Sequence, residues 1–223
     1  MDARTPRILV TGFEPFAGLG ENPAAVVAHE VSSRELPGIE LVSAVLPVRF
    51  HGLSERVSVL IHEHQPAAVL CLGVAIGSPV VRVETTAMNR ADFGVADDQG
   101  ESVHATMVLE GPAAHFATYD APAVASAIRA AGVPAALSHH AGTYLCNLTL
   151  FSFLEALAPS RPCGFLHLPL FPEHVAALLS RHERGASMAP LATPETASME
   201  RSLQTRAVIV ALETMRDALM RAC

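Results

Sequence analysis

The chain has 223 residues, half of them hydrophobic, and a formal net charge of −7. This length favours one large domain over residues 1–223 rather than two small ones. The negative charge and the lack of a basic cluster argue against a nucleic-acid partner, and no apolar run approaches the roughly 18 residues of a membrane span. The first residues lack the apolar region and cleavage site of a signal peptide, so we expect a cytoplasmic protein.

The predicted elements alternate between strands and helices. A buried strand is expected at residues 8–12, and Asn22 followed by Pro23 marks the start of a helix that runs to about residue 33. Apolar and alternating runs predict further strands at 40–46, 67–72, 80–88, 135–138 and 164–168. Helical spacing predicts further helices at 52–64, 121–131, 143–158 and 198–222. The polar stretches 94–104 and 185–196 are expected to be loops.

This alternation predicts an α/β fold, a three-layer sandwich in which helices cover both faces of a mostly parallel, twisted sheet. Sites in such folds gather where strand ends meet helix starts. Three segments of chemical interest are expected there: residues 12–22, the surroundings of Glu84, and residues 142–146.

The spacing of cysteines and histidines does not indicate a metal site. The four cysteines have no CxxC spacing, and the eleven histidines lack the i, i+4 pairing of a helical zinc motif. Cys71 and Cys163 are interpreted as small hydrophobic residues on or beside buried strands. We therefore expect neither a metal site nor a disulfide framework.

Cys146 and His167 together indicate thiol chemistry. Cys146 follows an Ala-Gly-Thr turn at a predicted helix start, where the helix lowers the thiol pKa and backbone N–H groups can stabilise an oxyanion. His167 ends an apolar strand and can take up and return a proton. The alternatives are a buried structural thiol and a satisfied histidine at a strand end, and the pair alone is a weak signal.

Two further features have both a structural and a functional interpretation. Glu84 lies on the alternating run 80–88, either as an exposed carboxylate on its polar side with Arg82, or as the group that orients a histidine. Phe13 and Phe16 lie in a glycine-containing loop, either as core residues or as an apolar wall for a small flat ligand. That loop lacks the Gly-Lys-Ser/Thr and dinucleotide fingerprints, although a helix N-terminus can bind anions.

Four segments in order resemble the family of pyroglutamyl peptidase I, also called pyrrolidone-carboxylate peptidase, a family of cysteine peptidases. They are residues 11–16 (TGFEPF) with Asn22-Pro23, Glu84 with Ala87 and Asn89, residues 141–147 (AGTYLCN), and residues 164–169 (GFLHLP). The resemblance covers nearly the whole chain, and the ordered set is far more specific than any one segment.

The resemblance implies an α/β sandwich with a triad of Cys146, His167 and Glu84. It implies that the protein removes an N-terminal pyroglutamyl (5-oxoprolyl) residue from peptides through a thioester, without metal or cofactor. It also implies a homo-oligomer, commonly a tetramer. The residues expected to contact the substrate are Phe13, Phe16, Val95, Tyr144 and Leu145.

The pocket segments depart from the family pattern. Residues 74–78 read Val-Ala-Ile-Gly-Ser where the family usually has Gln-Ala-Gly-Gly-Arg, and Gly94 stands at a usual arginine, for which Arg90 is a candidate substitute. Tyr144 replaces a usual phenylalanine. These departures leave two alternatives: a cysteine hydrolase of the same fold acting on another small cyclic or blocked amide, and a non-catalytic ligand-binding member. Nucleoside phosphorolysis, which similar sandwiches perform, is disfavoured because a thiol has no place in that chemistry.

Overall fold

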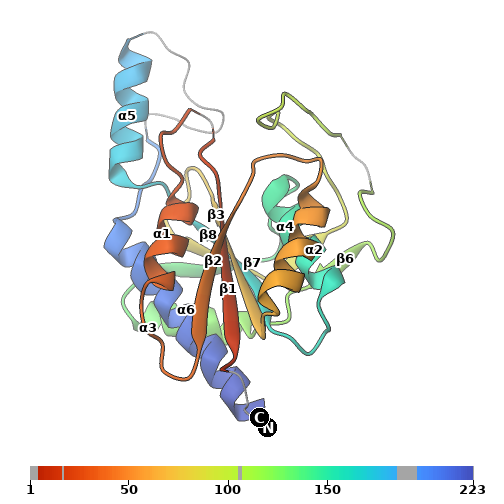
Figure 1. Ribbon diagram of the computed structural model, residues 1–223. Coiled ribbons are helices and arrows are strands. Elements are labelled where there is room, and N and C mark those ends of the chain that lie inside the picture. The colour runs from red at the N-terminus through yellow and green to blue at the C-terminus, as the bar shows by residue number, and fades with distance from the viewer. Residues whose placement is uncertain (1–4, 17, 105–106, 185–194, 223) are drawn as a thin grey trace.

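The computed structural model describes residues 5–16, 18–104, 107–184 and 195–222. Its centre is a six-stranded sheet (Figure 1). Across the sheet the strands are, in order, β2 (Glu40–Leu46), β1 (Arg7–Phe13), β3 (Ala68–Val74), β8 (Cys163–Leu168), β4 (Val81–Glu84) and β7 (Ala135–Ser138). The first four are parallel to one another, and β4 and β7 run antiparallel to them.

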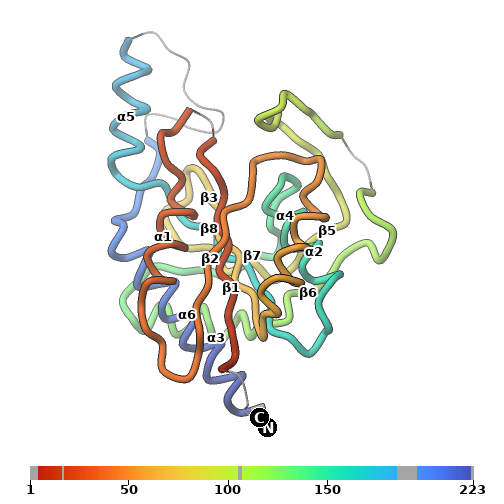
Figure 2. Tube along the Cα trace, in the orientation of Figure 1, coloured from red at the N-terminus to blue at the C-terminus, as the bar shows by residue number. Residues whose placement is uncertain are grey.

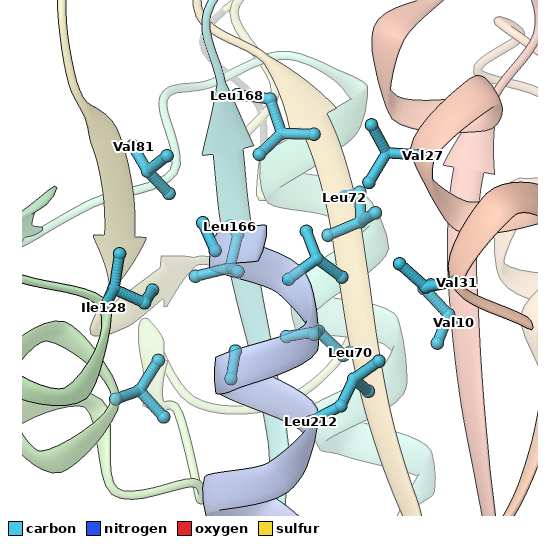
Figure 3. Packing of buried hydrophobic residues seen from close by; sticks show 14 of the residues in the cluster. Val10, Val27, Val31, Leu70, Leu72, Val81, Ile128, Leu166, Leu168 and Leu212 are labelled. Atoms are coloured by element: carbon cyan, nitrogen blue, oxygen red, sulfur yellow. The ribbon is translucent and has the colours of Figure 1, made fainter. Parts of the chain in front are cut away.

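Helices cover both faces of this sheet, which confirms the predicted three-layer α/β sandwich (Figures 1 and 2). On one face lie α1 (Pro23–Ser32), α3 (Ala121–Ala130) and α6 (Arg201–Ala222). On the other face lie α2 (Leu53–His64) and α4 (Leu145–Ala156). Figure 3 shows the first layer, where Leu70 and Leu166 of the sheet pack with Leu212 of α6. Two buried apolar layers thus hold the sheet in place.

Local sequence signals account for the elements that agree with prediction. The side chain of Asn22 accepts a hydrogen bond from the Ala24 N–H at 2.9 Å and so caps α1, whose first residue is Pro23. The strand expected at 40–46 is β2 with the same bounds. The start of α1 and both ends of β2 are therefore where the sequence predicted them.

The strand predicted at 80–88 is wrong as a single element. It is two strands: β4, and β5 (Thr86–Met88), which pairs with β6 (Ala114–Phe116) in a separate two-stranded sheet. The alternation of side chains continues across the break at Thr85, so periodicity could not reveal it. Glu84 is also buried rather than exposed on a polar side, because β4 is an interior strand of the main sheet.

Several boundaries and one helix differ from prediction. The helix α5 (Pro172–Glu183) was not predicted, and it stands away from the sheet beyond the strand ends (Figure 1). The helices expected from residues 143 and 198 begin at Leu145 and Arg201. Residues 185–194 of the predicted polar loop lie outside the described residues. Within the described ranges, no helix is long and apolar enough to cross a membrane.

Candidate active site

A pocket of about 460 Å³ opens on the α2–α4 side, where β1, β3 and β8 end. Every residue that the sequence analysis placed in the site lines this one pocket. Those residues are Phe13, Phe16, Glu84, Val95, Tyr144, Leu145, Cys146 and His167. They come from three strands, two loops and the start of α4, so the fold brings together segments that are far apart in the chain.

Cys146 is the second residue of α4, as the loop-to-helix interpretation predicted. The preceding turn contains Gly142 with φ +82°, a conformation that glycine adopts without strain. Tyr144 precedes α4 and its side chain makes no capping hydrogen bond. The first N–H groups of a helix have no intrahelical partner, so the first turn of α4 presents donors and positive potential beside the half-buried Cys146 thiol.

Gly73, which the sequence analysis did not single out, makes room for this thiol. A Cβ at Gly73 would lie 2.9 Å from Cys146 Sγ and 2.7 Å from Phe165 Cζ. Both distances are shorter than real side-chain contacts allow, so the thiol can sit against β3 only because residue 73 has no side chain. The one sequence signal was a glycine at the end of a buried strand.

His167 and Glu84 form a buried pair across the β8–β4 boundary. His167 Nδ1 lies 2.8 Å from Glu84 Oε1, and the Glu84 side chain is 0% exposed. Burial by itself lowers the pKa of His167, but the charge and hydrogen bond of Cys146, together with Glu84, outweigh it and raise this pKa to about 9. The imidazole therefore lies between a thiol and a carboxylate, the order that the resemblance implies.

Tyr119 holds the backbone under this pair, and the sequence analysis missed it. Its hydroxyl lies 3.0 Å from the carbonyl oxygen of Glu84 and 3.1 Å from that of Phe165, and donates between them. The ring occupies the space over Gly164, where a Cβ would come within 2.5 Å of it. The phenol thus ties β4 to β8 at the Glu84–Phe165 pair, two residue pairs away from the Arg82–His167 pair.

Two asparagines of the resembling segments have structural partners. The Asn147 side chain donates to the carbonyl oxygens of Met88 (2.8 Å) and Arg90 (3.0 Å), and its Oδ1 accepts from the Met88 N–H at 2.8 Å. Asn89 Oδ1 accepts from the N–H groups of Val108 and Leu109, each at 3.0 Å. Asn147 therefore fixes the start of α4 against the segment after β5, and Asn89 fixes the loop beyond it.

Part of the pocket wall is apolar and aromatic. Phe93 lies buried behind Tyr144, with ring centroids 4.6 Å apart in an edge-to-face arrangement. Burial, followed by the charges of Asp97 and Asp98, raises the pKa of Tyr144 to about 12, so its phenol stays neutral. Arg90 pairs instead with Asp92 at 2.9 Å and is absent from the pocket lining, so it does not substitute for the arginine replaced by Gly94.

The remaining thiols and histidines form no second centre in the part of the chain that the structure describes. There, no group of three His, Cys, Asp or Glu side chains could hold a metal ion. Cys71 and Cys163 are free and fully buried, as the sequence predicted, and burial raises the pKa of Cys71 to about 12.

A thiol at a helix N-terminus, facing an imidazole whose other nitrogen is held by a buried carboxylate, is the arrangement that cysteine hydrolases use. The fold and the site thus define a thiol-hydrolase-like α/β sandwich. The sequence model of the pyroglutamyl peptidase family matches residues 6–216, and this chain belongs to that family.

Individual relatives agree with this assignment. The pyrrolidone-carboxylate peptidase of Gloeobacter violaceus is 33% identical over 214 residues, covering 95% of this chain and 97% of that protein. That of Vibrio vulnificus strain CMCP6 is 36% identical over 173 residues, covering 77% and 82%. Among solved structures, the pyrrolidone carboxyl peptidase from Thermococcus litoralis superposes with a TM-score of 0.85 at 28% identity, covering 98% of this chain and 96% of that one.

Proposed function

We propose that this protein is a pyroglutamyl peptidase that removes an N-terminal pyroglutamyl residue from peptides, with Cys146 as nucleophile, His167 as general acid and base, and Glu84 as the residue that orients His167. The observation that carries the proposal is the buried Glu84–His167 pair at 2.8 Å beside the Cys146 thiol. The family match and the shared pocket support it.

The proposed mechanism accounts for each proton and charge. The Cys146 thiolate attacks the carbonyl carbon of the pyroglutamyl residue, and the N–H groups at the first turn of α4 bind the oxyanion. The His167 imidazolium donates its proton to the leaving amine, which gives a thioester. Neutral His167 then takes a proton from water, and the resulting hydroxide attacks the thioester and releases free pyroglutamate and the Cys146 thiol.

Glu84 acts through His167 rather than on the substrate. Its carboxylate accepts from Nδ1–H, which leaves Nε2 to exchange protons with the thiol and the leaving group. Because Glu84 is fully buried, its charge is weakly screened and favours the imidazolium. The tautomer needed for catalysis is therefore held before substrate arrives.

The pocket suits a flat, neutral, half-apolar ring. We assign Phe13, Phe16, Val95, Tyr144 and Leu145 to the contacts with the pyroglutamyl ring, since all of them line the pocket. An apolar wall with a neutral Tyr144 disfavours a charged free amino terminus, which would lose its hydration there. The protein should therefore select substrates with a blocked N-terminus, because a charged amino group would have to be desolvated in the pocket.

We further infer that residues 1–223 act as one domain, in the cytoplasm, as a homo-oligomer and without metal or cofactor. The family match over residues 6–216 supports a single unit. Size-exclusion chromatography with light scattering tests the number of subunits.

The test of the proposed function is hydrolysis of a pyroglutamyl-coumarin amide by the purified protein. Wild type should release the coumarin, Cys146→Ala should release none, and a prolyl-coumarin amide, which lacks the lactam carbonyl, should stay intact. Cys163→Ala is the matched control, because that thiol is buried outside the pocket, and it should keep the activity.

Alkylation separates the alternatives if no coumarin is released. Iodoacetamide near neutral pH should modify Cys146 rapidly and stoichiometrically in either enzyme. Rapid modification without pyroglutamyl hydrolysis would favour a cysteine hydrolase of another small cyclic or blocked amide, to which the altered segment 74–78 at the pocket points. An inert Cys146 would favour a ligand-binding member.

A further inference from the structure

One cationic side chain in the pocket has no role in the mechanism above. Arg82 is exposed and lines the same pocket as Cys146 and His167. Its guanidinium makes no hydrogen bond or ion pair with another described residue, and it is the only arginine among the described residues that line this pocket. An arginine held at a pocket wall without a partner can bind an anionic group of a ligand.

The sheet places Arg82 directly beside the histidine. In the antiparallel β4–β8 pairing, Arg82 is the residue opposite His167, and directly opposed residues have Cα atoms about 5 Å apart. Arg82 and Glu84 are two residues apart on β4, so their side chains point to the same face of the sheet. The Arg82 side chain therefore starts opposite His167 and on the same face of the sheet as the imidazole that protonates the leaving amine.

The carboxylates of the pocket do not neutralise this cation. Glu84 Oε1 pairs with His167, and its buried Oε2 has no hydrogen-bond partner among the described residues. Asp92 pairs with Arg90. The charge of Asp98 raises the pKa of Tyr144, which places Asp98 near the aromatic wall. The pocket thus has a positive side at the leaving group, formed by Arg82, and a negative side toward Asp98.

We propose that Arg82 is a positioning residue that binds a carboxylate on the leaving side of the scissile bond, so that the preferred substrates are pyroglutamyl dipeptides with a free C-terminus. This inference rests on the proposed function. In a dipeptide a single carbon atom separates the leaving nitrogen from the terminal carboxylate. When that nitrogen contacts His167 on β8, the carboxylate therefore lies near the neighbouring strand β4, which carries Arg82. An acidic side chain on the second residue also carries a carboxylate, but at a different position in the substrate.

The experiment compares three substrates that differ in the presence and position of one carboxylate. Pyroglutamyl-alanine has it at the C-terminus, pyroglutamyl-alanine amide has none, and pyroglutamyl-aspartate amide has it on the side chain. Wild type should hydrolyse the dipeptide acid with kcat/KM about three- to tenfold above the alanine amide, the range for a partly exposed charge-assisted contact. The aspartate amide should be close to the alanine amide. This preference should shrink as salt is raised from 0.05 to 0.5 M, because exposed charge pairs are screened.

Variants distinguish recognition of charge from a structural role. Arg82→Gln should lose most of the preference for the acid, while Arg82→Lys should keep part of it because the charge remains. Arg206→Gln is the matched control: Arg206 is also exposed and without a partner in the described part of the chain, but lies on α6 across the sheet. It should keep the wild-type ratio. Thermal unfolding of all four proteins checks that they are folded.

The outcomes are separable. Equal hydrolysis of acid and alanine amide by wild type, or an acid preference that Arg82→Gln retains, would overturn the inference and leave the proposed function intact. An equal loss on both substrates in Arg82→Gln would also overturn it, because it would show a role independent of substrate charge. A preference for the aspartate amide over the dipeptide acid would overturn the inference as stated, because the recognised carboxylate would then be that of the side chain. Failure of wild type to cleave all three substrates would overturn the proposed function and this inference with it.

Discussion

The proposed nucleophile packs against β3 at Gly73, and Gly73→Ala tests this contact. The added Cβ would lie 2.9 Å from Cys146 Sγ and 2.7 Å from Phe165 Cζ, where ordinary contacts begin at 3.4 Å. The strand backbone is held by neighbours on both sides, β1 and β8. The thiol and the phenylalanine ring must therefore move, each by at least about half an ångström.

The expected loss follows from this displacement. A misplacement of about 1 Å costs roughly 100-fold in rate, so a shift of about half that or more should lower kcat by about 10- to 100-fold. Overpacking in a closed interior costs about 1–3 kcal/mol of folding free energy. For a chain of this size each kcal/mol lowers the melting temperature by about 2–4 °C.

The assay measures kcat on the pyroglutamyl-coumarin amide, the rate of alkylation of Cys146 by iodoacetamide, and the melting temperature. Gly20→Ala is the matched control, because Gly20 is exposed and a Cβ there would meet nothing within 4 Å. It should resemble wild type in all three measurements. A Gly73→Ala protein with wild-type kcat and alkylation rate would refute the inference that the missing side chain is what admits the thiol.

The remaining predictions concern the groups around the imidazole. Because the pKa of His167 is raised to about 9, kcat/KM of the wild type should fall as the pH rises through about 9, where the imidazolium loses its proton. In Glu84→Gln this fall should come at lower pH. The kcat of this variant should also drop by about 10- to 100-fold, because the charge-assisted hydrogen bond to His167 is lost. The pKa of His167 in the folded protein lies above the usual histidine value of 6.5, so the associated stabilisation is complete below pH 6.5 and is lost as the pH rises through 9. Melting curves between pH 6 and 10 check the sign, and a wild-type melting temperature that rises over this range would contradict it. Tyr119→Phe removes the donor to the carbonyl oxygens of Glu84 and Phe165 and should cost about 1–3 kcal/mol in urea unfolding, whereas an unchanged unfolding midpoint would show that those oxygens need no donor.

Local signals in the sequence were enough for most of the fold. A capping asparagine followed by proline placed the start of α1, and the run of apolar residues at 40–46 placed β2. These features depend on neighbours within a few residues, where side-chain period and capping chemistry act directly. The same local reasoning placed Cys146 at a helix start and His167 at a strand end. The roles of these residues came from the resemblance of the ordered segments to a family.

The errors came where a pattern was compatible with two tertiary arrangements. The alternation over 80–88 continues through the bend at Thr85, so the division into β4 and β5 was not visible. No helix was predicted at α5, although it begins at Pro172 and proline is favoured at the first position of a helix. Neither choice can be made without knowing which surface the segment packs against.

By itself, the sequence determined the alternation of strands and helices, the three-layer class and the candidate residues of the site, since these follow from local periodicity and short motifs. Only the tertiary structure decided that β4 pairs antiparallel with β8, which buries Glu84 against His167 and leaves Arg82 open beside it. It alone showed that Gly73 makes room for Cys146. The physical reason is that these contacts join residues tens of positions apart, and strand pairing and packing, rather than neighbours in the chain, set their distances.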